Sequence, residues 1–312
     1  MSTTTGGRST ARHAAVLLVV PAALLGAALA WALAVPDPVQ SEAPLRALAD
    51  CAGATVLGLA ALPRLHEGRR PPWRLLAATG GLWAATEFAV LGCEAAQVVG
   101  VPMARLRLDR FATYLAHVSA GQVGLTIVLG TCAVTAYGAV AYRQRRQFGT
   151  DPVLVVAAVA LALRPITGHM SQQLFGSVLA AVHAVAAAVW LGLLSALALV
   201  ARTRGEWAVL LPRYSTWALP ALAAVALTGV CNGLIRLGGP GPLITTGYGR
   251  ILLAKAVLLV ALLALGWWWR RSWVPAAAGH KMTATSSLRR ALAEIVLMAL
   301  AFGLAATLAV TA

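Results

Sequence analysis

Side chains that can bind a metal ion lie within the longest apolar runs of this sequence, where polar groups are costly. His183 is the clearest case, because it interrupts an apolar run from Ser177 to Val200. A run of that length can span a bilayer core of about 30 Å. An ionisable residue in such a segment costs roughly 2.5–3.5 kcal/mol to insert, so His183 is a candidate functional residue.

Five further side chains of metal-ligand type are expected on the same side of the membrane, near its extracytoplasmic surface. They are Cys93, Glu94, His117, His169 and Met170. The last two lie in the short connection that precedes the run of His183, and the other three lie near the outer ends of their own runs. Imidazole, thioether and thiolate ligands together favour copper over magnesium or calcium. The set therefore predicts a copper site in the extracytoplasmic half of the membrane.

Four of these side chains also have a purely structural interpretation. A histidine on a membrane helix is often held by a hydrogen bond to a neighbouring helix, which applies to both His117 and His183. Met170 can be an ordinary loop residue. Glu94 lies at a depth similar to that of Lys255, and the two are predicted to meet as an intramembrane ion pair. A metal site is favoured because all the candidates are expected on the same side of the membrane and at a similar depth in it.

The composition predicts a membrane protein with many spans. Hydrophobic residues make up 60% of the chain and charged residues 11%, and the mean hydropathy is +0.78, whereas about 25% of residues are charged in a soluble domain. The net charge of +15 comes from basic residues at the ends of the apolar runs. This placement favours contact with membrane lipid, and we expect no nucleic acid as a partner.

The apolar runs, separated by prolines, glycines and charge clusters, predict an all-α bundle of about nine transmembrane helices, with eight as the alternative. The expected helices are 14–35, 45–63, 74–99, 112–142, 152–166, 176–201, 215–237, 249–270 and 289–311. The first run is too long for the apolar part of a signal peptide and is expected to remain as a membrane helix. We divide the chain into an N-terminal four-helix membrane region, residues 1–150, and a second membrane domain, residues 151–312.

The distribution of basic residues predicts the orientation of the bundle. If the N-terminus is cytoplasmic, 17 lysines and arginines fall on the cytoplasmic side and 8 on the other side. Basic residues are enriched in cytoplasmic loops, so we expect the N-terminus in the cytoplasm. With nine helices the C-terminus then lies outside.

Five short strings occur in a fixed order in the C-terminal half of the chain. They are Arg164-Pro-Ile-Thr-Gly-His169; His183 followed by Trp190-Leu-Gly192; Arg213-Tyr-Ser215 leading to Leu227-Thr-Gly229; Thr246-Gly-Tyr-Gly-Arg-Ile-Leu-Leu-Ala-Lys255; and Leu288-Arg-Arg290 ahead of Glu294. The second and fourth strings are the most specific. In this order the strings resemble the CopD copper-resistance family of bacterial inner-membrane proteins, over roughly residues 155–312.

The resemblance implies that the protein handles copper at the bacterial cytoplasmic membrane, with uptake into the cytoplasm as the usual inference. It implies that His169 and His183 are a ligand pair and that Trp190 packs beside the site. It also implies that three residues shape the outer mouth of the site, namely Tyr248, Arg250 and Lys255. An extracytoplasmic copper-binding protein is a further expected partner, and copper homeostasis is the expected role.

Two other functions are compatible with the same ligands. A b-type membrane cytochrome also uses histidines on transmembrane helices to hold haem iron, and His117 with His183 would serve. A copper-binding assembly factor would keep the ligands without a conducting path. The sequence has no Walker loop, no Ser/His/Asp arrangement and no H-E-x-x-H motif, so we do not expect an enzyme.

Overall fold

The protein is a bundle of long helices, as the sequence predicts. The structure is a computed structural model that describes residues 17–66, 68–144, 148–166, 176–237 and 241–311. Within these residues seven helices are long and apolar enough to cross a membrane. They are α3 (Ala43–Leu65), α4 (Trp73–Val99), α6 (Ser119–Gln144), α8 (Gly176–Val200), α9 (Arg204–Leu237), α11 (Gly247–Ala278) and α12 (Ala284–Leu308). The chain is thus a multi-pass membrane protein.

Two shorter helices correspond to the remaining predicted runs. α2 (Val19–Ala34) and α7 (Asp151–Ile166) have 16 residues each, which is about 24 Å at 1.5 Å per residue. Some long helices extend past the predicted bounds, since α9 begins at Arg204 and α11 ends at Ala278. An apolar run marks the part of a helix that suits lipid, whereas the helical backbone continues into the polar residues beyond it.

The segment predicted as one helix, 112–142, forms parts of two helices. α5 (Leu108–His117) is followed by Val118, whose backbone is extended (φ −108°, ψ 124°), and α6 begins at the next residue. Tyr114 of α5 packs in a buried cluster with residues of α4 and α6, whereas Asp109 is exposed. One apolar face suits a helix that lies against the bundle at the membrane surface rather than one that crosses the membrane.

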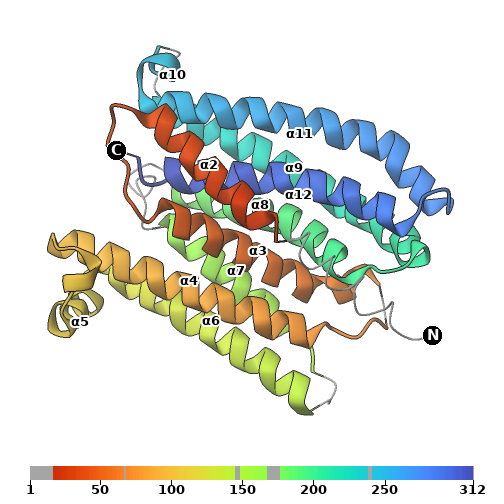
Figure 1. Cartoon of the computed structure of the whole chain (residues 1–312), viewed down its shortest axis with the longest axis horizontal. Coiled ribbons are helices and arrows are strands. Elements are labelled where there is room, and N and C mark those ends of the chain that lie inside the picture. Colours follow the sequence, from red (N-terminus) through yellow and green to blue (C-terminus); the bar gives the residue numbers. More distant parts are fainter. Residues whose placement is uncertain (1–16, 67, 145–147, 167–175, 238–240, 312) are drawn as a thin grey trace.

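α3 lies at the centre of the bundle. It packs against α2, α4, α7, α8 and α12, and Figure 1 shows α11 along one edge of the molecule and α4 with α6 along the opposite edge. α3 and α8 approach closely at Gly58 and Gly192, where a side chain on either glycine would overlap the backbone of the other helix. Contacts between small residues allow membrane helices to pack this closely.

One end of the bundle gathers most of the candidate residues. α4 ends and α11 begins at this end, and α5 and α10 (Pro242–Thr245) lie there too, on the left in Figure 1. We call it the outer end, after the orientation that the basic residues predict. The opposite end carries the turn between α11 and α12.

Candidate metal site

His183 is held in one orientation by a hydrogen bond between two helices. Its Nδ1 atom lies 2.9 Å from Oγ1 of Thr228 on α9. The Thr228 hydroxyl group donates its only proton to the carbonyl oxygen of Ala224, at 2.5 Å, so its oxygen is left to accept a proton from His183. The hydrogen-bond network therefore assigns His183 as the Nδ1–H tautomer, with the lone pair on Nε2.

This tautomer leaves Nε2 of His183 as the ligand atom. Metal-binding histidines usually donate their other ring N–H to a fixed acceptor, which orients the ring and increases its basicity. The side chain is half-buried, and Gly229 faces the ring, since a Cβ atom there would lie 3.4 Å from His183 Cε1. The ammonium group of Lys255 on α11 acts electrostatically on the imidazole. His183 can thus bind a metal ion through one defined nitrogen atom.

A buried carboxyl group lies deeper in the bundle, between α8, α9 and α12. Glu294 is 6% exposed, and its Oε1 accepts hydrogen bonds from Trp190 Nε1 at 3.2 Å and from the Tyr214 hydroxyl at 3.1 Å. Trp190 follows His183 by seven residues on the same face of α8, about 10 Å farther along the helix. The resemblance predicts that Trp190 lies beside the metal site. In the structure the indole N–H of Trp190 donates its hydrogen bond to Glu294, deeper in the bundle than His183.

The three residues predicted to shape the outer mouth lie in the first turns of α11. Arg250 donates to backbone carbonyls at the end of α2, including that of Val35 at 2.5 Å, and so connects α11 to α2. The Tyr248 ring lies 5.2 Å from the guanidinium carbon of Arg236. Lys255 lies deeper and is half-buried. Arg250 and Tyr248 therefore have structural contacts of their own at the outer end.

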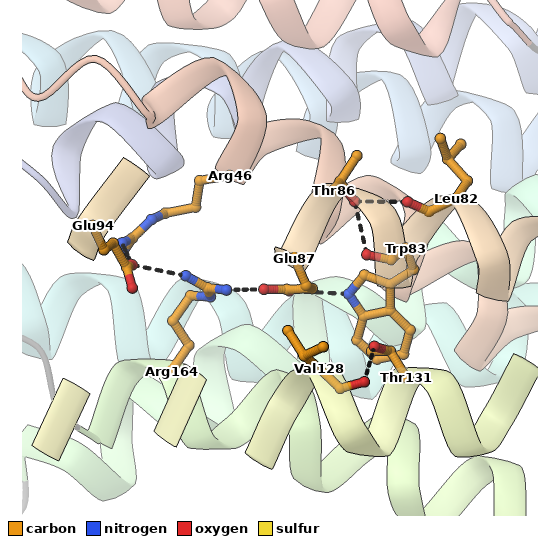
Figure 2. A network of polar contacts seen from close by, with 9 residues as sticks. All are labelled: Arg46, Leu82, Trp83, Thr86, Glu87, Glu94, Val128, Thr131 and Arg164. Atoms are coloured by element: carbon orange, nitrogen blue, oxygen red, sulfur yellow. Dashed lines mark hydrogen bonds and ion pairs between the residues drawn. The ribbon is translucent and has the colours of Figure 1, made fainter. Parts of the chain in front are cut away.

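A second polar region, between α3, α4 and α7, is built from ion pairs (Figure 2). Glu94 Oε1 lies 2.6 Å from Nη2 of Arg46 and 3.2 Å from Nη1 of Arg164. Arg164 also pairs with Glu87 through its Nη2 atom. Trp83 donates from Nε1 to Glu87, at 3.1 Å. These contacts connect three helices near the outer end.

The predicted ion pair between Glu94 and Lys255 is wrong. Glu94 pairs instead with Arg46 and Arg164, because α3 and α7 lie on this side of the bundle, whereas α11 packs against α2, α9, α10 and α12. Tyr114 on α5 interacts electrostatically with Glu94. Burial and the charge of Glu94 raise the pKa of Tyr114 to about 12, so its hydroxyl stays protonated at neutral pH.

Two candidate ligands of the N-terminal region lie apart from His183. The prediction that His117 lies on a transmembrane helix is wrong, because it is exposed at the end of α5. Cys93 is partly exposed near the end of α4, and its Sγ lies 3.5 Å from Sδ of Met103. α4 and α5 pack against each other and against α6, and α4 also packs against α3.

The remaining candidate ligands, His169 and Met170, lie in segment 167–175, outside the residues that the structure describes. Among the described residues, no group of three or more histidine, cysteine, aspartate or glutamate side chains could hold a metal ion. The ligand pair of His169 with His183 therefore stays a prediction. So do the ligand roles of Cys93 and Glu94.

Sequence reasoning missed the residues that fix these side chains. Thr228 stands in a string that was singled out for the resemblance, and Arg164 begins another. Arg46 is the second residue of the predicted helix 45–63. A basic residue in an apolar run could have identified it as a candidate partner of a buried carboxyl group. None of these signals shows which helices face one another.

Comparison with known proteins agrees with the resemblance over the C-terminal part of the chain. A sequence model of the CopD family, described as copper resistance protein D, matches residues 208–308. The copper transport protein CutJ of Bacillus subtilis (strain 168) is 28% identical in an alignment of 158 residues, which covers 46% of this chain and 28% of that protein. The chain therefore spans only 28% of the length of this curated relative. No solved structure matches the chain.

Proposed function

We propose that this protein, in which residues 208–308 match the copper resistance protein D family, transports copper across the bacterial cytoplasmic membrane into the cytoplasm. The similarity to a copper transport protein supports copper as the substrate. The candidate membrane-spanning helices support a path through the bilayer. The observation that carries the proposal is the hydrogen bond between His183 Nδ1 and Thr228 Oγ1 inside the bundle, which leaves the lone pair of the ring on Nε2.

Copper chemistry fits the surroundings of His183. Cu(I) needs few ligands and accepts imidazole nitrogen and thioether sulfur. Nε2 of His183 supplies one ligand, and we propose that His169 and Met170 complete the site, as the family resemblance implies. Lys255 places a positive charge near the site. A nearby cation weakens the binding of a metal ion, which suits a transport site because the ion must also leave.

Polar groups continue inward from His183 along the C-terminal half of the chain. Thr228 lies at the level of His183, and Glu294 with Trp190 and Tyr214 lies deeper between the same helices and α12. Polar side chains inside a membrane are costly, and those that are present often line the pathway of a substrate or an ion. We propose that copper moves along this side of the bundle.

Copper binding by purified variants tests the proposal. His183→Ala should remove one equivalent of bound Cu(I), because it deletes the ligand nitrogen, while the protein still inserts into the membrane. His117→Ala is the matched control, since its imidazole is exposed on α5 and should contribute nothing. Equal copper binding by the parent and His183→Ala would contradict the proposal.

Two further measurements separate transport from the alternative functions. The proposal predicts colourless protein with bound copper, so a Soret band in the absorption spectrum would instead identify a haem protein. A copper-binding assembly factor would bind copper without moving it. Copper influx into proteoliposomes distinguishes that function from transport.

A further inference from the structure

A thiol and a thioether meet at the outer end of α4. Cys93 Sγ lies 3.5 Å from Sδ of Met103, which belongs to the short helix η1 (Met103–Arg105) that follows α4. Met103 is 49% exposed and Cys93 is partly exposed, so the pair lies at the surface of the bundle. Gly92 makes room for this contact, since a Cβ atom there would lie 2.8 Å from Met103 Cε.

Two acidic side chains lie near the thiol group of Cys93. The carboxyl groups of Glu42 and Glu94 act electrostatically on the Cys93 thiol. Glu94 is paired with arginines. Glu42 is fully buried and accepts a hydrogen bond from Gln97 on Oε2, but its Oε1 has no partner among the described residues. Glu42 also interacts electrostatically with Arg164, so its charge is partly compensated within the bundle.

The types of ligand atom indicate which ion would bind. Thiolate and thioether sulfur are soft ligands that select Cu(I) over hard cations such as magnesium or calcium. Cu(I) also tolerates low coordination, so two sulfur atoms are sufficient. Cys132 and Cys231 are exposed cysteines without such a sulfur contact among the described residues. They serve as controls for a cysteine that has no second sulfur ligand nearby.

We propose that Cys93 and Met103 form a Cu(I)-binding site at the outer end, which receives copper before the site of His183; this inference rests on the proposed function. When Cu(I) binds, the S–H bond of Cys93 breaks, its proton leaves to water, and a Cu–S bond forms. Met103 donates a sulfur lone pair. Copper stays Cu(I), so no electron donor is needed, and the bound ion leaves the net charge of the site unchanged.

Competition with bicinchoninate, a coloured chelator of Cu(I), tests the site on the purified full-length chain without oxygen. The parent should bind one equivalent through the sulfur pair in addition to that of His183. Cys93→Ser and Met103→Leu should each weaken the sulfur site by more than the roughly 10- to 100-fold that is typical of losing an outer-shell partner. Cys132→Ser, the matched control, should bind as the parent does.

Gly92→Ala tests the geometry without removing a ligand. The added methyl group would push the end of the flexible Met103 side chain, so the sulfur site should weaken by less than in Met103→Leu. X-ray absorption of copper bound to His183→Ala should show sulfur ligands. Nitrogen ligands there would overturn the site.

The two proposals fail in different ways. If Cys93→Ser and Met103→Leu bind as much Cu(I) as the parent while His183→Ala loses one equivalent, the sulfur site is wrong and the proposed function stands. If only the sulfur variants lose copper, the sulfur site stands and the role of His183 is wrong. Met103→Leu decides the question should Cys93→Ser not fold, because Met103 lies at the surface and leucine matches its size.

Discussion

Glu87 and Glu94 in the N-terminal region and Glu294 in the C-terminal half are stabilised in different ways. In the N-terminal region Glu87 and Glu94 pair with arginine side chains from α3 and α7. In the C-terminal half Glu294 accepts hydrogen bonds from a tryptophan and a tyrosine. Among the described residues it forms no ion pair.

This difference indicates different roles for the two regions. Each charge in a buried ion pair is compensated only while its partner is present, so the network of α3, α4 and α7 must stay whole. A carboxyl group held by two neutral donors can be replaced by a neutral group without leaving a second charge uncompensated. We therefore expect the N-terminal network to stabilise the bundle, and the C-terminal polar groups to serve the substrate.

Breaking the arginine–carboxylate network should have the largest effect on stability. Arg164→Met removes the ion partner of Glu87, which is 3% exposed, and an uncompensated buried charge costs about 3–5 kcal/mol. We expect a large decrease in the melting temperature in detergent. The double variant Arg164→Met/Glu87→Gln should recover part of the loss. Additive losses would show that the two side chains do not depend on each other.

A change of charge at Glu294 should be tolerated better than the same change at Glu87. Glu294→Gln keeps an oxygen acceptor, so its free energy of unfolding should decrease by no more than about 1.5 kcal/mol, whereas Glu294→Leu leaves buried donors unpaired at a cost of about 1–3 kcal/mol. Melting temperatures of Glu294→Gln, Glu294→Leu and Glu87→Gln make the comparison. Similar losses for the two glutamine variants would remove the distinction between the halves.

The smallest effect on stability is expected at Thr228, where the change should act on copper instead. Thr228→Val keeps the shape of the side chain but removes the acceptor for His183 Nδ1. Losing such an outer-shell partner lowers metal affinity by about 10- to 100-fold. Thr126→Val is the control, because the exposed Thr126 hydroxyl bonds to the backbone of its own helix. Unchanged copper affinity in Thr228→Val would show that this bond does not orient the ligand.

The helices could be predicted from the sequence because lipid leaves the backbone few alternatives. Apolar runs must satisfy their backbone polar groups internally and therefore form helices. The exception was 112–142, where the apolar face of α5 adjoins the apolar run of α6. An extended residue, Val118, separates the two helices, and no proline or glycine marks it.

The partners of the polar residues could not be predicted, because depth in the membrane does not show which helices are neighbours. Glu94, Lys255, Arg46 and Arg164 are all expected near the outer surface. Glu94 pairs with the two arginines because α3 and α7, rather than α11, lie beside this part of α4. His183 was identified because a single ionisable residue in a long apolar run is conspicuous. Its orientation required the contact with α9.

Copper influx into proteoliposomes tests most directly whether copper crosses the membrane past His183. Cu(I) is supplied outside, and a chelator trapped inside reports its arrival, for the parent, His183→Ala and His117→Ala. We expect influx with the parent and with His117→Ala, and for His183→Ala no more influx than in protein-free vesicles. Influx through His183→Ala at the rate of the parent would contradict a transport path at this residue.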